Sequence, residues 1–355
     1  MRKTNSLERI QKLTEMCLLE ERILSPKTLH FGRQIIYWEC HEQLWSEAIP
    51  DYHYESRFLS FKRALRPGSN LYHVAVWEHL ISEFSKAALT VPTDRLVAIA
   101  GLAKEMDATV NGALGDYYAG VWEFEFLDQL CWFCMIGPTF WSLGRRDQYI
   151  APSWSWASVN NPVKQAMRYY SPQYFSDVIS ITTELKRESE PFGLVSSGTL
   201  TIRGCLHEVN FIDNISLRRV NDSEEMEITQ GSKSEKSVHN LIAQSLLWDY
   251  DPSDIVGLTR HIENVRSLPF YVLMIREAHM WQKNKEHEPE GEIRGMFCLL
   301  LQLTGNARGQ YQRVGGVLFD DESTEVLKET TGLQDLPKKC YLEANELGRY
   351  TIEII

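Results

Sequence analysis

The spacing of hydrophobic residues divides the chain into a first part with a helical period and a second part with a strand period. In the first part, apolar side chains recur every three or four positions, which is typical of one face of a helix. Three such stripes predict helices over residues 71–84, 96–103 and 120–130, and an earlier helix ends before Pro26. Residues 34–40 alternate instead and are rich in β-branched and aromatic side chains, so they predict a strand.

In the second part the strand period dominates. Residues 149–159 alternate, so we expect Trp154 and Trp156 to lie on one face of a strand. Because proline has no N–H to donate, we expect the strand to start at Pro152 or to lie at the edge of a sheet. Six further strands are predicted, over residues 178–183, 199–207, 270–276, 293–304, 311–319 and 350–355.

Helical segments precede the strands rather than alternating with them. This order predicts an α+β fold, with a mainly helical N-terminal half followed by a β-rich C-terminal half. We expect a helical region at residues 1–150 and a β-rich domain at residues 151–355. Within the second domain, polar stretches at 217–237 and 282–292 predict loops, and residues 241–247 predict a short helix.

The overall charge narrows the classes of partner. The chain of 355 residues has 37 Lys and Arg against 48 Asp and Glu, a net charge of −11. A net negative chain without a basic stripe repels phosphate backbones, so we expect no nucleic-acid partner. The apolar runs, such as residues 296–301, are all far shorter than the roughly 18 residues of a membrane span. An odd number of cysteines, seven, without a secretory signal favours reduced thiols, so we expect a cytoplasmic protein with no membrane partner.

Local motifs for catalysis, cofactor binding or metal binding are missing from the sequence. It has no glycine-rich phosphate loop, nucleophile elbow or zinc-protease helix, so we predict no catalytic residue, no cofactor and no metal ligand. Cys131 and Cys134 form a C-x-x-C pair that we expect late in an apolar helix, and we interpret them as core cysteines, with thiol exchange and zinc binding as alternatives. Asp249 and Asp251 could hold a divalent cation, although Pro252 favours a turn there.

Several segments, read together, resemble one family. Residues 21–32, 38–40, 93–103, 118–122, 149–159, 309–315 and 350–355 resemble, in the same order, motifs of the fungal heterokaryon-incompatibility (HET) domain proteins. The resemblance therefore spans nearly the whole chain. The motif residues, which we interpret as structural, are Glu21, Leu24, Ser25, His30, Phe31, Trp38, Glu39, Cys40, Asp94, Arg95, Gly101, Trp122, Pro152, Trp154, Trp156, Tyr311, Arg313 and Gly315.

One part of the HET proteins, their N-terminal core, has no counterpart in this sequence. HET proteins normally begin with an α/β core, thought to be similar to TIR domains, and nothing in this sequence resembles the W-x-D motif of that core. We therefore expect the chain to be the region downstream of the core, with the core missing or shortened, through a truncated gene model or as a natural remnant. Without a core to cover them, Leu18, Leu19, Ile23 and Ile36 are expected to form an exposed apolar patch.

The resemblance implies a non-catalytic interaction or regulatory role in fungal non-self recognition and heterokaryon-incompatibility cell death. The expected partner is a protein, either an intact HET protein or a recognition subunit. A TIR-like NAD-cleaving effector is the alternative if the core is present in the true gene product, with Glu21 and Glu39 as the motif-matched carboxylates. A third hypothesis is a thiol-redox protein that acts through Cys131 and Cys134.

Overall fold

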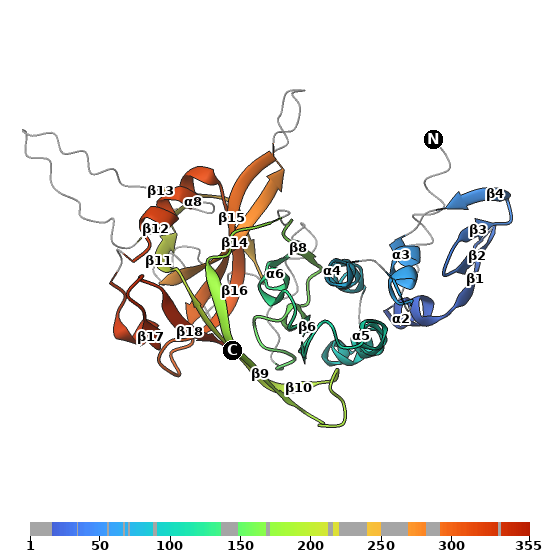
Figure 1. Ribbon diagram of the computed structural model, residues 1–355, viewed down its shortest axis with the longest axis horizontal. Helices are drawn as coiled ribbons and strands as arrows, with labels where there is room; N and C mark the ends of the chain where they lie inside the picture. The colour runs from blue at the N-terminus through green and yellow to red at the C-terminus, as the bar shows by residue number, and fades with distance from the viewer. Residues whose placement is uncertain are drawn as a thin grey trace, which may run out of the picture.

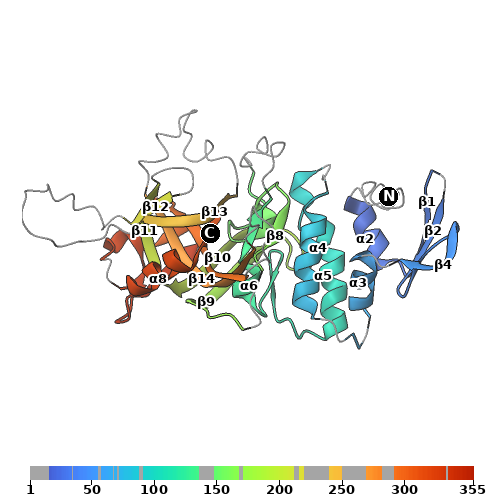
Figure 2. The same cartoon turned by 90° about the horizontal axis from the view of Figure 1, so that it is seen from above.

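The chain forms an elongated molecule with a small sheet at one end and a large sheet at the other (Figure 1). Helices stand between the two sheets, as the view from above shows (Figure 2). The computed structural model describes residues 16–33, 35–54, 57–66, 68–69, 72–87, 91–135, 148–167, 171–211, 216–219, 240–249, 269–281, 292–332 and 335–355.

The small sheet is antiparallel, and its four strands follow one another in chain order. They are β1 (Lys27–Phe31), β2 (Ile36–Cys40), β3 (Leu44–Ser46) and β4 (Ile49–Tyr54). The strand predicted over residues 34–40 is thus confirmed as β2. One face of the sheet lies toward two short helices, α2 (Met16–Leu24) and α3 (Arg57–Ala64) (Figure 1).

Two longer helices form the next layer, α4 (His73–Phe84) and α5 (Val97–Val110), the second preceded by the short η1 (Pro92–Asp94). The stripes predicted for both are confirmed, because their apolar residues are buried. Gly101 of α5 lies where α2 crosses, and a Cβ added there would lie only 1.8 Å from Oε1 of Glu20. A side chain at position 101 would therefore have to displace the carboxylate of Glu20.

The helix predicted over residues 120–130 is wrong. Short elements replace it: β5 (Tyr117–Tyr118), β6 (Val121–Trp122) and α6 (Phe126–Gln129). Gly120 has a φ of +99° and Glu125 a φ of +53°, values that a continuous right-handed helix does not contain. The backbone carbonyl of Gly120 accepts hydrogen bonds from the indoles of Trp77 (3.1 Å) and Trp156 (2.8 Å), which fixes this turn in the core.

The strand predicted over residues 149–159 is also wrong. Ser155 instead caps the one-turn helix η2 (Trp156–Ser158), its hydroxyl accepting a hydrogen bond from a backbone N–H. Trp154 and Trp156 are both buried, but Trp154 packs on a ring of α6 and Trp156 on a ring of α4. The alternation of serine and tryptophan arises in a turn and not in a strand. Beside this segment, β7 (Trp132–Cys134) pairs with β8 (Val163–Gln165).

The large sheet has ten strands and follows the order β13-β12-β11-β14-β15-β16-β18-β10-β9, with β17 beside β18. Its elements are β9 (Ser176–Leu185), β10 (Val195–Gly204), β11 (Leu206–Phe211), β12 (Ser216–Arg219), β13 (Asn240–Trp248), β14 (Phe270–Trp281), β15 (Glu292–Leu303), β16 (Gln310–Phe319), β17 (Glu343–Ala344) and β18 (Tyr350–Ile354). Helices α8 (Asp321–Glu329) and η5 (Lys338–Cys340) lie between β16 and β17. Five of the six strands predicted after residue 159 are confirmed, whereas the strand predicted over residues 199–207 is divided at Cys205 between the end of β10 and the start of β11.

β13 pairs with β16 as well as with β12, so six strands from β13 to β16 close into a barrel. The short helix predicted over residues 241–247 is therefore wrong, because this segment forms most of β13. Strand β9 ends the open arm of the sheet, and among the strands of the described residues it pairs with β10 alone. Of the predicted loops, residues 217–219 belong to β12, and the remainder up to 237 and residues 282–291 lie outside the described parts.

The prediction of a mainly helical N-terminal half is wrong. Strand makes up 37% of the structure and helix 26%, and the N-terminal half has few helices beside its own four-stranded sheet. The physical reason lies in β1 and β3, which bury only alternate residues and are five and three residues long. Such short strands carry enough polar residues to resemble loops between helices.

One hydrophobic core cluster joins the helices to the large sheet. Its largest fully buried side chains are the five indoles of Trp77, Trp122, Trp132, Trp154 and Trp156. A second cluster lies on the opposite face of β14 and β15, where both faces are buried. Large rigid rings at the junction hold layers of different architecture together.

Candidate functional site

Several of the motif residues meet on the inner face of the small sheet, around the carboxylate of Glu39. Arg22 of α2 contacts Oε2 of Glu39 through Nε at 2.8 Å and Nη2 at 2.6 Å, and His30 Nε2 lies 2.9 Å from the same oxygen. Lys62 of α3 lies 3.5 Å from Oε1, and the Glu39 side chain is fully buried. Lys62 also donates to the carbonyl of Ser25 at 2.9 Å. The cluster therefore ties both short helices to β1 and β2.

The surrounding cations determine the charge of Glu39. Burial alone would raise the pKa of this carboxyl, but hydrogen bonds from His30 and Arg22, with the charges of Arg22 and Lys62, lower the pKa to about 2. For Lys62 burial outweighs the attraction of Glu39, so the pKa of its ammonium group is lowered. Glu39 is thus a fixed anion at neutral pH, suited to holding its neighbours in place rather than to donating a proton.

We expect Glu39→Gln to lower the free energy of unfolding by about 3 kcal/mol at pH 7, because the depressed pKa stabilises the folded state above the unfolded pKa. That contribution is lost as the pH falls from about 4.5 toward 2, so the difference between variant and wild type should shrink over this range. Urea unfolding at several pH values measures it. Glu42→Gln is the matched control: Glu42 pairs with Arg66 but its side chain is 68% exposed, so we expect less than about 0.5 kcal/mol. A pH-independent difference for Glu39→Gln would contradict the prediction.

The opposite face of the small sheet is mostly apolar and partly exposed, and Lys27 stands on it 5.9 Å from the centre of the Trp38 ring. We call it the outer face; it is made by five side chains that stand opposite one another in register, Leu29, Phe31, Ile36, Trp38 and Trp45. Phe31 is 76% exposed, Leu29 47% and Trp45 38%. The sheet lies at the far end of the molecule, beyond α2 and α3 (Figure 1). Contiguous exposed apolar side chains of this kind mark an interaction surface.

The predicted apolar patch is placed differently from the expectation. Ile23 is 1% exposed and belongs to the core, so this part of the prediction is wrong. Ile36 is half-buried on the outer face, while the side chains of Leu18 and Leu19 lie outside the described parts. Leu24 is partly exposed on α2. Alternation along β1 is what exposes Leu29 and Phe31 instead, because the sheet turns every second residue outward.

Arg313 forms the second buried cluster and joins β16 to β7. Its Nε contacts Oδ2 of Asp249 at 2.9 Å, its Nη1 donates to the carbonyl of Leu130 at 2.8 Å, and its Nη2 donates to that of Trp132 at 2.5 Å. The guanidinium also stacks 3.4 Å from the centre of the Trp132 ring. Burial raises the pKa of Asp249 to about 6 against the opposing charge of Arg313. Asp249 is therefore engaged by an arginine and not placed to ligate a cation, while Asp251 lies outside the described parts.

The C-x-x-C pair is in the core. Cys131 and Cys134 are at most 1% exposed, and burial raises the pKa of Cys131 to about 12 and that of Cys134 well above its usual value. Both are free thiols, placed just before and within β7 rather than in the expected helix. Their protonated, inaccessible state supports the interpretation as core cysteines.

The other motif residues are spread over the fold. Arg95 is buried with its guanidinium 5.1 Å from the Trp156 ring centre, and the hydroxyl of Tyr311 donates to a carbonyl of η5 at 2.8 Å. Of the rest, Glu21 and Asp94 are exposed, Cys40 is half-buried, Pro152 and Trp122 are buried, and Gly315 lies in β16 between β13 and β15. The structure thus unites Ser25, His30 and Glu39 in one cluster, Phe31 and Trp38 on one face of the small sheet, and Arg95 with Trp156 in the core.

Sequence reasoning missed Lys62 of the Glu39 cluster and a further buried ion pair, between Asp128 and Arg276. Lys62 lies outside every family segment, and Asp128, which pairs with Arg276 of β14 at 2.8 Å, has no motif around it. Arg22 lies in the segment at residues 21–32 that resembles a HET motif. Its position in that segment, next to Glu21, was the one sequence signal that could have marked it as a site residue. Pairs formed between distant segments leave no local pattern.

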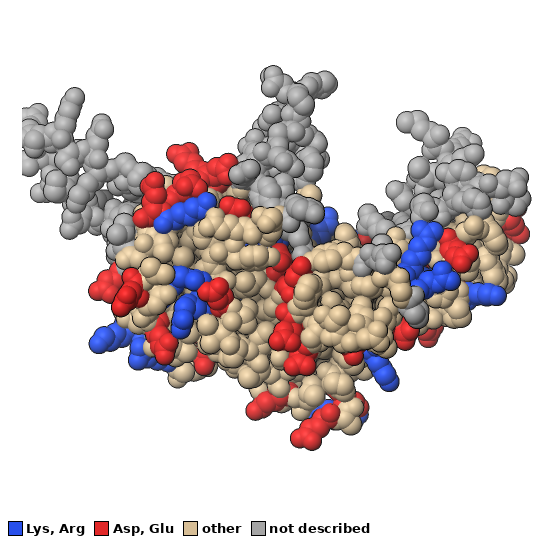
Figure 3. All heavy atoms as spheres, in the orientation of Figure 1, with Lys and Arg blue, Asp and Glu red and all other residues tan. Residues whose placement is uncertain are grey.

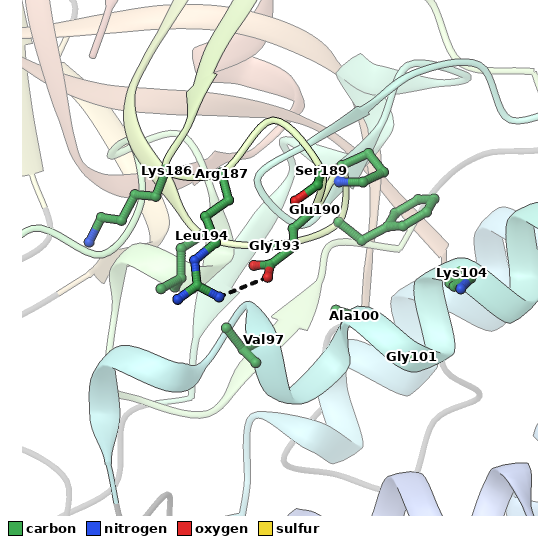
Figure 4. A pocket seen from close by; sticks show the side chains of 12 residues that line it. Val97, Ala100, Gly101, Lys104, Lys186, Arg187, Ser189, Glu190, Gly193 and Leu194 are labelled. Carbon is green, nitrogen blue, oxygen red and sulfur yellow. Dashed lines mark hydrogen bonds and ion pairs between the residues drawn. The ribbon is translucent and has the colours of Figure 1, made fainter.

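A cleft of about 760 Å³ lies between α5 and the turn that joins β9 to β10 (Figure 4). Val97, Ala100, Gly101 and Lys104 line one side, and residues 186–194 line the other. Figure 4 shows Val97 pointing toward the ion pair of Arg187 and Glu190, whose atoms are 2.9 Å apart. The lining has no histidine or cysteine, and the described parts of the chain hold no group of three or more potential metal ligands.

No family model, no curated protein and no solved structure matches this chain. None of the helices in the described parts is both long enough and apolar enough to cross a membrane. The function must therefore be argued from the surfaces and clusters themselves.

Proposed function

We propose that the chain is a cytoplasmic HET-family interaction protein that acts in fungal non-self recognition and incompatibility-linked cell death by binding an intact HET protein, without a reaction of its own. The outer face of the small sheet is the observation that carries this proposal. Three of its side chains are between 38% and 76% exposed, and they form one surface with Trp38 and Ile36.

The construction of the small sheet supports a binding role. Aromatic side chains that lie side by side on a rigid support are typical of the centre of protein interfaces. Here the support is the Glu39 cluster, which fixes β1 and β2 from behind. The segments at residues 21–32 and 38–40, which resemble HET motifs, build both the cluster and the face. The resemblance and the exposed surface therefore meet in the same part of the molecule.

The proposal is tested by titrating the purified chain against purified intact HET proteins encoded in the same genome, using isothermal titration calorimetry. Phe31→Ser should weaken binding roughly 10- to 100-fold, because a phenylalanine buried at an interface contributes about 1.5–3 kcal/mol. Leu347→Ser is the matched control: Leu347 is 75% exposed, close to the 76% of Phe31, but lies beside the large sheet. Its affinity should stay within twofold of wild type.

Two outcomes would overturn the proposal. One is binding that Phe31→Ser leaves unchanged, and the other is no binding to any intact HET protein at micromolar concentrations. Binding only to a separate recognition subunit would assign the outer face to that partner instead. Incubation of the chain with NAD provides a further check, since product formed by the wild type and lost in Glu21→Gln would favour the catalytic alternative.

A further inference from the structure

We propose that the groove between β9 and α6 binds an extended, lysine- and arginine-rich segment of a partner protein, which adds as a strand to the free edge of β9. This site is separate from the outer face. It lies on the large sheet, whereas the outer face belongs to the small sheet at the other end of the molecule (Figure 1). The two proposals can therefore fail independently.

The groove runs along the edge of β9. It has a volume of about 560 Å³, and six consecutive residues of β9, 176–181, line one side. Successive residues of a strand point to opposite faces of the sheet, so a groove that touches six in a row follows the edge and not one face. The other side is formed by α6 and by the segment before it, with Tyr118 and Tyr174 at the ends.

The backbone of β9 is open along this edge. Just before the strand, the N–H of Phe175 donates to the carbonyl of Ile275 at 2.8 Å, and the carbonyl of Gln173 accepts from Glu277 at 3.0 Å, so β14 occupies the edge up to that point. From Asp177 onward, within the described parts of the chain, β9 pairs only with β10. Ile179 forms a β-bulge against β10, between Val178 and Ser180. On either side of this bulge, alternate N–H and C=O groups of the free edge have no main-chain partner within the described parts, which is the arrangement that accepts an added strand.

The charge of the lining selects the partner. Four carboxylates line the groove, those of Glu123, Glu125, Asp128 and Asp177, and no lysine, arginine or histidine side chain joins them. Figure 3 shows acidic side chains gathered over the middle of the molecule, where α6 and β6 lie. A basic segment complements such a surface, and the net charge of −11 draws it in from a distance.

Two of these carboxylates already form ion pairs with arginine side chains of the protein itself. Asp128 pairs with Arg276 at 2.8 Å and accepts a hydrogen bond from the hydroxyl of Tyr174, and Asp177 pairs with Arg349 at 2.7 Å. Glu123 is exposed and its carboxylate accepts a hydrogen bond from the N–H of Asp116 at 3.1 Å, and Glu125 is half-buried beside it; these are the side chains that we expect to meet the incoming cations. Exposed rings contribute too, since Tyr174 is 43% exposed and an arginine or lysine can stack on it.

The test uses the full chain and fluorescein-labelled peptides in anisotropy titrations at low and at physiological salt. The basic peptide alternates lysine or arginine with valine, and the acidic peptide replaces each basic residue by glutamate. A third peptide has the basic sequence with alternate backbone amides methylated, so that it keeps its charge but cannot donate to β9. We expect the basic peptide alone to bind, and its affinity to fall as salt rises.

Variants of the groove locate the binding. The double variant Glu123→Gln/Glu125→Gln should weaken binding of the basic peptide at least roughly 10-fold. Glu184→Gln/Glu188→Gln is the matched control, because Glu184 and Glu188 are exposed residues in and just after β9 that do not line the groove. It should stay within twofold of wild type.

Each other outcome overturns the proposal. Equal binding of the acidic and basic peptides would remove the charge argument, and equal binding of the methylated peptide would remove strand addition. Equal weakening by the control variant would indicate a general charge effect, and no binding of the basic peptide at 1 mM would exclude the site. Far-ultraviolet circular dichroism of each variant confirms that it is folded.

Discussion

Replacement of Arg313 by methionine is expected to lower the free energy of unfolding by about 3–5 kcal/mol. The change leaves the buried carboxylate of Asp249 without its cation and leaves the carbonyls of Leu130 and Trp132 without their donors. It also removes the stack on the Trp132 ring. Because these contacts connect β16 to β7, the loss should weaken the junction between the large sheet and the central layer rather than one strand alone.

The measurement is urea unfolding followed by tryptophan fluorescence, with the double variant Arg313→Met/Asp249→Leu as control. Removing both charges takes away the uncompensated carboxylate, so the double variant should recover a large part of the lost stability. A double variant as unstable as the sum of the two single variants would show that the ion pair itself is not the cause. In that case the hydrogen bonds to the two carbonyls would account for the effect.

Trp154→Ala is expected to cost about 3–5 kcal/mol, the usual range for removing a buried aromatic side chain. Trp154 is completely buried, packs on Phe126 and accepts the indole N–H of Trp132 at its carbonyl. Its own Nε1 has no hydrogen-bond partner within the described parts of the chain. Trp154→Phe therefore loses volume but no hydrogen bond, and we expect it to cost less than half as much.

Denaturation midpoints of both variants decide whether the segment at residues 149–159 is structural. Trp45→Ala serves as the exposed control, since Trp45 is 38% exposed on the outer face and should change the free energy of unfolding by less than about 1 kcal/mol. A midpoint for Trp154→Ala close to that of wild type would refute the structural interpretation. The indoles would then be available as a platform for a ligand instead.

Helices and strands whose hydrophobic residues recur with the same period along their whole length could be predicted from the sequence, and irregular elements could not. The stripe of α4 and the strands of the large sheet follow their expected periods, because one or both of their faces are buried along their whole length. At residues 120–130 the helical spacing of Trp122, Phe126 and Leu130 is accidental. Trp122 reaches the core from β6, while Phe126 and Leu130 belong to the single turn of α6 and its cap. The left-handed residues Gly120 and Glu125 prevent one helix from containing all three.

The candidate sites, like the fold, have residues that could be predicted from the sequence and residues that could not. His30 and Glu39 could be singled out because they lie in segments that resemble a family, but Lys62 lies 3.5 Å from Glu39 with no signal in its own surroundings. The outer face required the register of three strands, which places Trp38 between Leu29 and Trp45. The groove at β9 needed the sheet order itself, since only the topology shows which strand keeps a free edge.

The position of β18 has a consequence for how the molecule is made. This strand, residues 350–354, lies between β10 and β16, with Leu200 opposite Ile354. During translation β10 leaves the ribosome about 150 residues before β18. The β9–β10 hairpin therefore lacks its pairing partner β18 while the barrel strands are being synthesised. Pairing over such a sequence distance is slow. During synthesis both edges of the β9–β10 hairpin are therefore open, and this stage is the one most in need of chaperones.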